Sequence, residues 1–105
     1  TPARRRIAVL GEMLELGRWS EDLHREVGRY AARCGTNVLV GIRGAAEHLV
    51  DAGRHAGLAP EASLFFSEPE EAGRFLKTIA GEGDALLFKC SRGTRVELAL
   101  EAFLN

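Results

Sequence analysis

Residues 7–17 read IAVLGEMLELG, and this stretch decides how the chain folds. Residues 7–10 are all apolar, and Gly11 ends the run. A continuous apolar run of this length is typical of a strand that is buried on both faces, as in a parallel sheet. A charged loop, Gly11–Gly17, comes next at the carboxyl end of that strand. Open α/β sheets bind their ligands at such ends, so the stretch predicts both a fold and a place for a site.

The rest of the chain alternates in the same way. Further short apolar runs occupy residues 38–42, 64–66 and 85–88, and segments with helical spacing lie near 20–34, 45–56, 67–79 and 94–104. For the first helix we expect an N-cap at Ser20, an end at Gly35, and an apolar face made of Leu23, Val27, Tyr30, Ala31 and Cys34. The alternation of strands and helices predicts a three-layer α/β/α, Rossmann-like domain with a mainly parallel sheet of four or more strands.

Length and composition narrow the class of protein. A chain of 105 residues predicts a single domain over residues 1–105. The net charge of −1 gives no general attraction for nucleic acid or for an anionic membrane, and no segment is apolar enough to span a bilayer. Cys34 and Cys90 are isolated, and neither has a histidine at metal-ligand spacing. We therefore expect a cytoplasmic protein without a metal site, nucleic-acid partner or membrane partner.

Three loops share the carboxyl edge of the predicted sheet: Gly11–Gly17, Arg43-Gly44 and Lys89–Gly93. The first loop matches neither the dinucleotide-binding motif nor the P-loop. Its carboxylates, Glu12 and Glu15, would repel a phosphate and suit a cation such as an ammonium group. The alternative is that both are solvated loop charges.

Two further features could belong to this edge. In the segment Lys89–Gly93, the side chains of Ser91 and Arg92 and the backbone N–H groups suit a carboxylate or a phosphate. The alternative is that they only cap a helix and add surface charge. His24 lies one turn into the first predicted helix. It is either a helix-face histidine with a local hydrogen bond or a residue that orients the Gly11–Gly17 loop.

Taken together, these motifs resemble the C-terminal domain of the Mur ligases, bacterial enzymes of peptidoglycan biosynthesis. The similarity runs from about Arg5 to the last helix. It rests on GEMLELG at 11–17, on His24-x-x-x-Gly28, and on Lys89-x-Ser91-Arg92. Within the family it points to the ligases that add D-alanyl-D-alanine to UDP-N-acetylmuramoyl-tripeptide.

The resemblance implies a three-domain, ATP-dependent ligase of the bacterial cytoplasm. In it, ATP and Mg²⁺ are bound mainly by a central domain and convert the tripeptide carboxylate to an acyl phosphate, which the amine of the dipeptide attacks. The C-terminal domain closes over the ATP site and helps to place the dipeptide. The positions that would face the active site are Glu12, Glu15, His24, Lys89, Ser91 and Arg92.

In this interpretation the loop carboxylates suit the ammonium group of the dipeptide, and Ser91 and Arg92 suit its carboxylate or a phosphate. No catalytic residue is expected in this chain, which should be inactive alone. The sequence departs from the family at Cys90, where glycine is usual and cysteine should strain the loop, and at Glu12, where aspartate is common.

The chain is expected to be a fragment that begins just after the family's Asn-Ala-Asn-Pro segment. Its sheet would then lack an edge strand, and unpaired backbone groups of that kind invite association. Two other functions remain open from the sequence. The chain could be a stand-alone Rossmann-like module that binds a nucleotide or an anion, or it could be an interaction domain.

Overall fold

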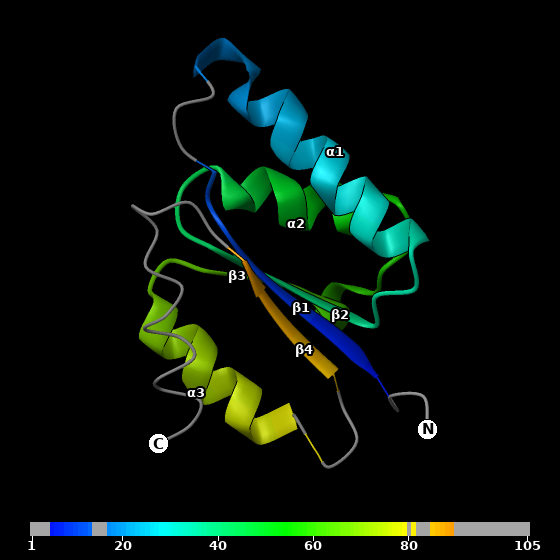
Figure 1. Cartoon of the computed structure of the whole chain (residues 1–105), viewed down its shortest axis with the longest axis vertical. Coiled ribbons are helices and arrows are strands. Elements are labelled where there is room, and N and C mark those ends of the chain that lie inside the picture. The colour runs from blue at the N-terminus through cyan, green and yellow to red at the C-terminus, as the bar shows by residue number, and fades with distance from the viewer. Residues whose placement is uncertain (1–4, 14–16, 80, 82–84, 90–105) are drawn as a thin grey trace.

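In the computed structural model, which describes residues 5–13, 17–79, 81 and 85–89, four parallel strands form one sheet (Figure 1). The strands are β1 (Arg6–Gly11), β2 (Val38–Ile42), β3 (Ser63–Phe66) and β4 (Ala85–Lys89). Their order across the sheet is β3-β2-β1-β4, and each neighbouring pair is parallel. The predicted α/β class and parallel sheet are confirmed.

Helices cover both faces of this sheet. α1 (Ser20–Arg33) and α2 (Ala46–His55) lie on one face, and α3 (Pro69–Ile79) lies on the other (Figure 1). Short 3-10 turns at Gly17–Trp19 and Pro60–Ala62 precede α1 and β3. Within the described ranges, none of the helices has both the length and the apolar character needed to cross a membrane. Because helices lie on both faces of the sheet, the three predicted layers are present. The helix expected near 94–104 lies outside the described residues.

The central strand β1 supplies side chains to a core on each side of the sheet. Successive side chains of a strand point to opposite faces. Ile7 and Val9 pack in the cluster that includes α3, and Ala8 packs in the cluster that includes α1 and α2. All three are at most 7% exposed. The continuous apolar run in the sequence reflects this burial on both faces.

The buried face of α1 matches the expected one only in part. Leu23 and Tyr30 are 42% and 70% exposed, whereas the buried residues of the helix are His24, Gly28 and Ala31. The expectation is confirmed for Ala31 and for Val27, which packs against the same core cluster. It was wrong for Leu23, Tyr30 and the exposed Cys34, because α1 packs against α2 through its small residues. A Cβ atom on Gly28 would overlap the backbone oxygen of Leu49 and lie 2.9 Å from its carbonyl carbon, so only glycine allows this approach.

The two ends of α1 show how local sequence sets helix limits. The 3-10 turn runs directly into α1, which places Trp19 at the N-cap position and Ser20 inside the helix, so the expected cap at Ser20 was wrong. At the other end, Gly35 has φ +86°, and the Thr36 N–H donates to the carbonyl oxygen of Ala31. This is the hydrogen bond of a Schellman ending, and the expected end at Gly35 is confirmed.

Replacing Gly28 by alanine tests the contact between α1 and α2. Alanine favours a helix by up to about 1 kcal/mol over glycine, but overpacking costs about 1–3 kcal/mol. Because the added Cβ would meet backbone rather than a movable side chain, we expect Gly28→Ala to lower the free energy of unfolding by about 2 kcal/mol. Urea denaturation measures the change. Glu26→Ala, at an exposed position of the same helix, should stay within about 0.5 kcal/mol. A stabilised Gly28→Ala variant would contradict the close contact.

Candidate functional site at the carboxyl edge of the sheet

The strand order creates a switch point between β1 and β4. The chain proceeds from β1 outward to β2 and β3, and then crosses the sheet to place β4 on the other side of β1. In the register of the sheet, Leu10 pairs with Lys89 and Gly11 pairs with Ile42, so the strands end at one edge. Open α/β sheets bind ligands at this edge, beside the switch point. The loops that leave β1 and β4 are the two that flank it.

Glu12, the first residue after β1, is bound to the start of α2. Its Oε2 atom accepts a hydrogen bond from the Ala45 N–H at 2.8 Å, and its own N–H donates to the carbonyl oxygen of Ile42 at 3.0 Å. Amide groups at a helix N-terminus lack helical partners and carry partial positive charge, which favours a carboxylate there. The structure thus places Glu12 in contact with the N-cap of α2, which apolar patterning in the sequence does not predict.

The connection from β2 to α2 has an unusual backbone. Arg43 and Gly44 both have positive φ, +69° and +46°. The N–H of Arg43 donates to the carbonyl oxygen of Phe66, and its guanidinium lies 3.7 Å from the carboxylate of Glu68. Positive φ in a non-glycine residue is uncommon and often marks a functional segment. Arg43 therefore links the ends of β2, β3 and α3 at the same edge of the sheet.

His24 anchors the β1–α1 loop (residues 12–16) from the other side. The imidazole is fully buried, its Nε2 accepts a hydrogen bond from the Met13 N–H at 2.9 Å, and its Nδ1 donates to the carbonyl oxygen of Ser20 at 2.6 Å. Since a carbonyl can only accept, Nδ1 carries the hydrogen and Nε2 is free to accept. Both interpretations of His24 hold, because one ring nitrogen bonds locally and the other holds the loop.

Of the other candidate residues, Lys89 is the last residue of β4 and so lies at the same edge of the sheet as Glu12. Glu15, Ser91, Arg92 and Cys90 lie outside the described residues. Among the residues that are described, no group of three or more His, Cys, Asp or Glu side chains could hold a metal ion.

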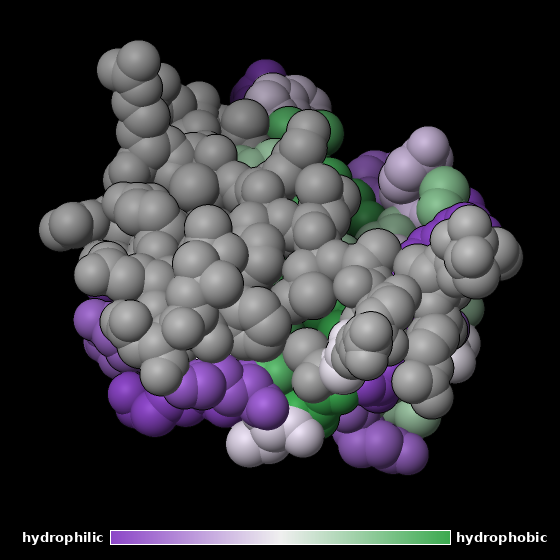
Figure 2. All heavy atoms as spheres, turned by 60° about the horizontal axis from the view of Figure 1, so that its bottom comes forward, coloured by the Kyte–Doolittle hydropathy of each residue, from purple (hydrophilic) through white to green (hydrophobic). Residues whose placement is uncertain are grey.

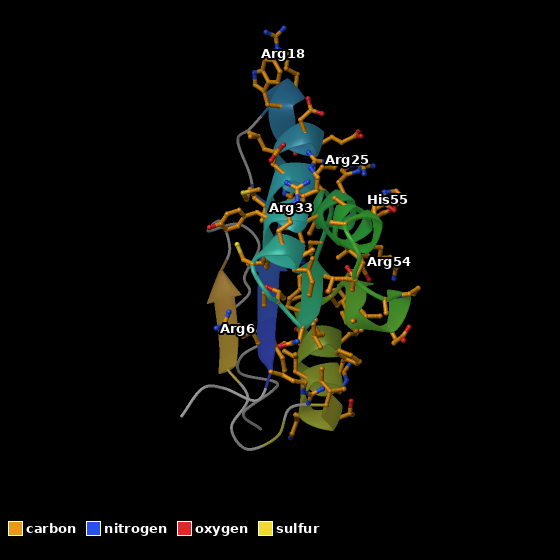
Figure 3. The ribbon with its side chains drawn as sticks, turned by 90° about the vertical axis from the view of Figure 1, so that its right-hand side faces the viewer. Arg6, Arg18, Arg25, Arg33, Arg54 and His55 are labelled. Carbon is orange, nitrogen blue, oxygen red and sulfur yellow. The ribbon has the colours of Figure 1, made fainter. Side chains whose placement is uncertain are left out.

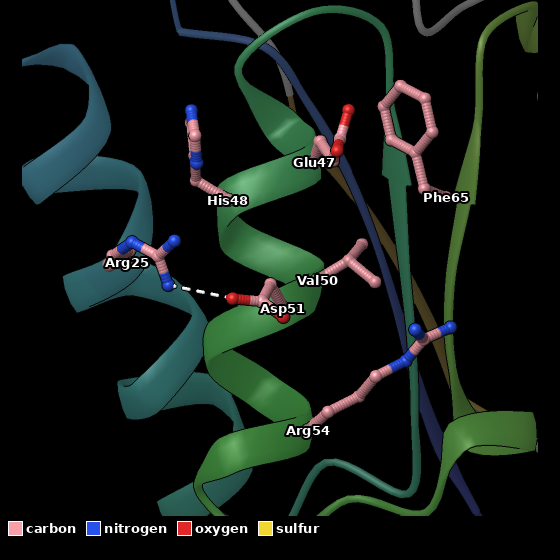
Figure 4. Close-up of a pocket in the computed structure, with 7 residues that line it drawn as sticks. All are labelled: Arg25, Glu47, His48, Val50, Asp51, Arg54 and Phe65. Carbon is pink, nitrogen blue, oxygen red and sulfur yellow. Dashed lines mark hydrogen bonds and ion pairs between the residues drawn. The ribbon is translucent and has the colours of Figure 1, made fainter.

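A hollow of about 590 Å³ lies beside α2, away from the candidate residues named above (Figure 4). Its charged groups bind neighbouring elements: Arg25 pairs with Asp51 at 2.9 Å, and the Nε of Arg54 donates to the carbonyl oxygen of Ser63 at 2.9 Å. The hydrogen bond from Arg25 lowers the pKa of the Asp51 carboxyl below its usual value. These contacts join α1, α2 and β3, so the charged groups named here already bind other parts of the chain. The carboxyl edge of the sheet is therefore the stronger candidate site. The lining residues are Arg25, Glu47, His48, Val50, Asp51, Arg54 and Phe65.

Among the described residues, the labelled basic side chains do not mark a different site. The labelled basic side chains in Figure 3 are spread along the molecule, from Arg18 at one end to Arg6 toward the other, and do not gather on one face. Figure 2 shows hydrophobic side chains between hydrophilic ones at the end that it turns to the viewer.

Comparison with known proteins gives a consistent result. The family model described as "Mur ligase, glutamate ligase domain" matches residues 1–92. A UDP-N-acetylmuramoyl-tripeptide–D-alanyl-D-alanine ligase from Synechocystis is 37% identical over 91 residues, which are 87% of this chain and 19% of that protein.

Solved structures agree. The crystal structure of the MurF ligase of Thermotoga maritima in complex with ADP superposes with a TM-score of 0.75 and 30% identity, and the match covers 94% of this chain and 21% of that one. A MurF structure from Acinetobacter baumannii gives a TM-score of 0.76 and 27% identity over 92% of this chain and 21% of that one. The chain thus spans about a fifth of the length of these relatives.

Substitution of His24 tests the anchor of the loop. His24→Ala removes the acceptor of the Met13 N–H and leaves a cavity, and we expect it to lower the free energy of unfolding by about 2–3 kcal/mol. His24→Gln can offer an amide oxygen to the same N–H and should recover part of this loss. As a control, His55→Ala, at a side chain that is 76% exposed, should change stability by less than about 0.5 kcal/mol. Equal effects at the two histidines in urea denaturation would rule out the anchor.

Proposed function

Because the chain belongs to the Mur ligase family, we propose that it is the C-terminal domain of an ATP-dependent ligase that joins D-alanyl-D-alanine to UDP-N-acetylmuramoyl-tripeptide. The observation that carries this proposal is the 37% identity to a ligase of that name over 87% of the chain. Residues 1–105 would form one domain of a longer enzyme of bacterial peptidoglycan synthesis in the cytoplasm. The crystal structure of the Thermotoga relative with ADP supports the use of ATP.

The domains of such an enzyme would have different roles in the reaction. We assign ATP and Mg²⁺ mainly to the rest of the enzyme, in line with the resemblance to three-domain ligases. The contribution of this domain is to present the loops after β1 and β4 to the dipeptide. A fragment that supplies only these loops would be inactive by itself.

Five of the six candidate residues then have a proposed role here. Glu15 suits the ammonium group of the dipeptide, and Ser91 and Arg92 suit its carboxylate, because an arginine guanidinium can bind a carboxylate through two parallel hydrogen bonds. Lys89, at the end of β4, would add positive charge near that carboxylate. His24 acts one step away from the ligand, since its contacts are with Met13 and Ser20.

The alternative of a stand-alone anion-binding module gains no support from α2. An anion would bind most readily where amide groups at a helix N-terminus are available. At α2 the carboxylate of Glu12 already binds the Ala45 N–H. The described contacts therefore favour the ligase over a phosphate-binding function at this helix.

Kinetics of the full-length enzyme test the proposal. We expect Glu15→Ala and Arg92→Ala each to raise the KM for D-alanyl-D-alanine or to lower kcat by at least tenfold, which corresponds to about 1.4 kcal/mol of transition-state stabilisation. Arg74→Ala, at an exposed position of α3, is the matched control and should leave both constants unchanged. Unchanged kinetics in both site variants would remove these residues from the site. Absence of dipeptide ligation by the unmodified enzyme would refute the function itself.

A further inference from the structure

The segment between β2 and α2 is shaped around the carboxylate of Glu12. A Cβ atom on Gly44 would lie 2.6 Å from the carboxyl carbon of Glu12 and 2.7 Å from its Oε1 atom, closer than real side chains approach. The φ of Gly44, +46°, also favours glycine. The next residue, Ala45, donates its N–H to Oε2 of Glu12. Glycine at 44 therefore makes room for the carboxylate, and the amide at 45 binds it.

Glu12 is fixed through its backbone as well as its side chain. Its N–H donates to the carbonyl oxygen of Ile42, the last residue of β2, while its carboxylate binds one residue before the start of α2. The residue after it, Met13, is held through its N–H by His24 of α1. The first two residues of the β1–α1 loop are thus attached to both helices on this face of the sheet. These contacts fix Glu12 and Met13 at the carboxyl edge of the sheet.

We infer that Glu12 is a positioning residue, which holds the β1–α1 loop against the N-terminus of α2, and that it is not the group that binds the ammonium of the dipeptide. This inference rests on the proposed function, because it assigns a role within the same site. It gives the two carboxylates of the loop different roles. Glu12 orients the loop, and other residues recognise the ammonium group.

The neutral variant Glu12→Gln separates the two roles. Glutamine keeps an oxygen that can accept the hydrogen bond of the Ala45 N–H but loses the negative charge. In the full-length ligase we expect Glu12→Gln to keep kcat/KM for the dipeptide within about threefold of the unmodified enzyme, and Glu12→Ala to lower it at least tenfold. If Glu12 instead bound the ammonium group, both variants would lose activity to a similar extent. That result would overturn the inference.

Glu47→Gln is the matched control for charge. Glu47 is an exposed carboxylate in the first turn of the same helix, so its loss changes the charge near the N-terminus of α2 without touching the loop. We expect its kinetic constants to match those of the unmodified enzyme. If it lost activity as Glu12→Ala does, the effect would come from the charge of the helix end and the positioning role would be refuted.

A double-mutant cycle tests the contact without using activity. Gly44→Ala pushes a Cβ into the carboxylate of Glu12 in the unmodified chain, but in Glu12→Ala the carboxylate is gone and only the strain of positive φ remains. We therefore expect Gly44→Ala to lower the urea midpoint of the 105-residue chain more than it lowers that of the Glu12→Ala variant. Equal shifts would show that the two residues do not interact and would overturn the inference.

The ligation assay and the double-mutant cycle together show whether a failure belongs to this inference or to the proposed function on which it rests. If the unmodified full-length protein did not ligate the dipeptide, the proposed function would fall, while coupling in the urea cycle would still support the anchoring of the loop. If ligation were present and the cycle additive, the function would stand and the positioning role would fall.

Discussion

The fold depends on β1, which has a neighbouring strand along each edge and a packed core on each face. This strand pairs with β2 on one side and β4 on the other. Its side chains enter the α3 core through Ile7 and Val9, and the α1–α2 core through Ala8. A strand in this position can carry no charged side chain along its buried length, because an unpaired buried charge is too costly. Charged side chains are therefore confined to the two ends of β1, to Arg6 at its start and to Glu12 just after Gly11.

The loop that leaves β1 is held in place from its first residue. Glu12 binds the β2–α2 connection, and Met13 binds His24 of α1. A binding site works best when its groups are held in the productive geometry before the ligand arrives, since ordering them later reduces affinity. In the proposed ligase, such anchoring would fix Glu12 and Met13 before the ligand arrives. The same constraint explains Gly44, whose place in the fold is defined by a side chain of the neighbouring loop.

Much of this arrangement could be predicted from the sequence. The apolar runs indicated the strands, the glycine at 35 indicated the end of α1, and the parallel order placed the loops at one edge. Apolar spacing predicted only part of the buried face of α1, because the helix packs closely through Gly28 and leaves Tyr30 exposed. The contact between Glu12 and Ala45 joins residues that are 33 positions apart, and only the strand order brings them together. In the sequence, Gly44 next to Arg43 indicated an unusual backbone at this point, but it did not indicate that Glu12 would lie against it.

Amide hydrogen exchange at Met13 and Ala45 is the most direct test of the claim that the loop is held by both helices. In the structure each of these amides donates to a side chain of another element of the site, Met13 to His24 and Ala45 to Glu12. The account predicts that both amides exchange at least roughly 100-fold more slowly than amides of an unstructured loop, because exchange requires these bonds to open. Exchange of either amide at the rate of an unstructured peptide would contradict it.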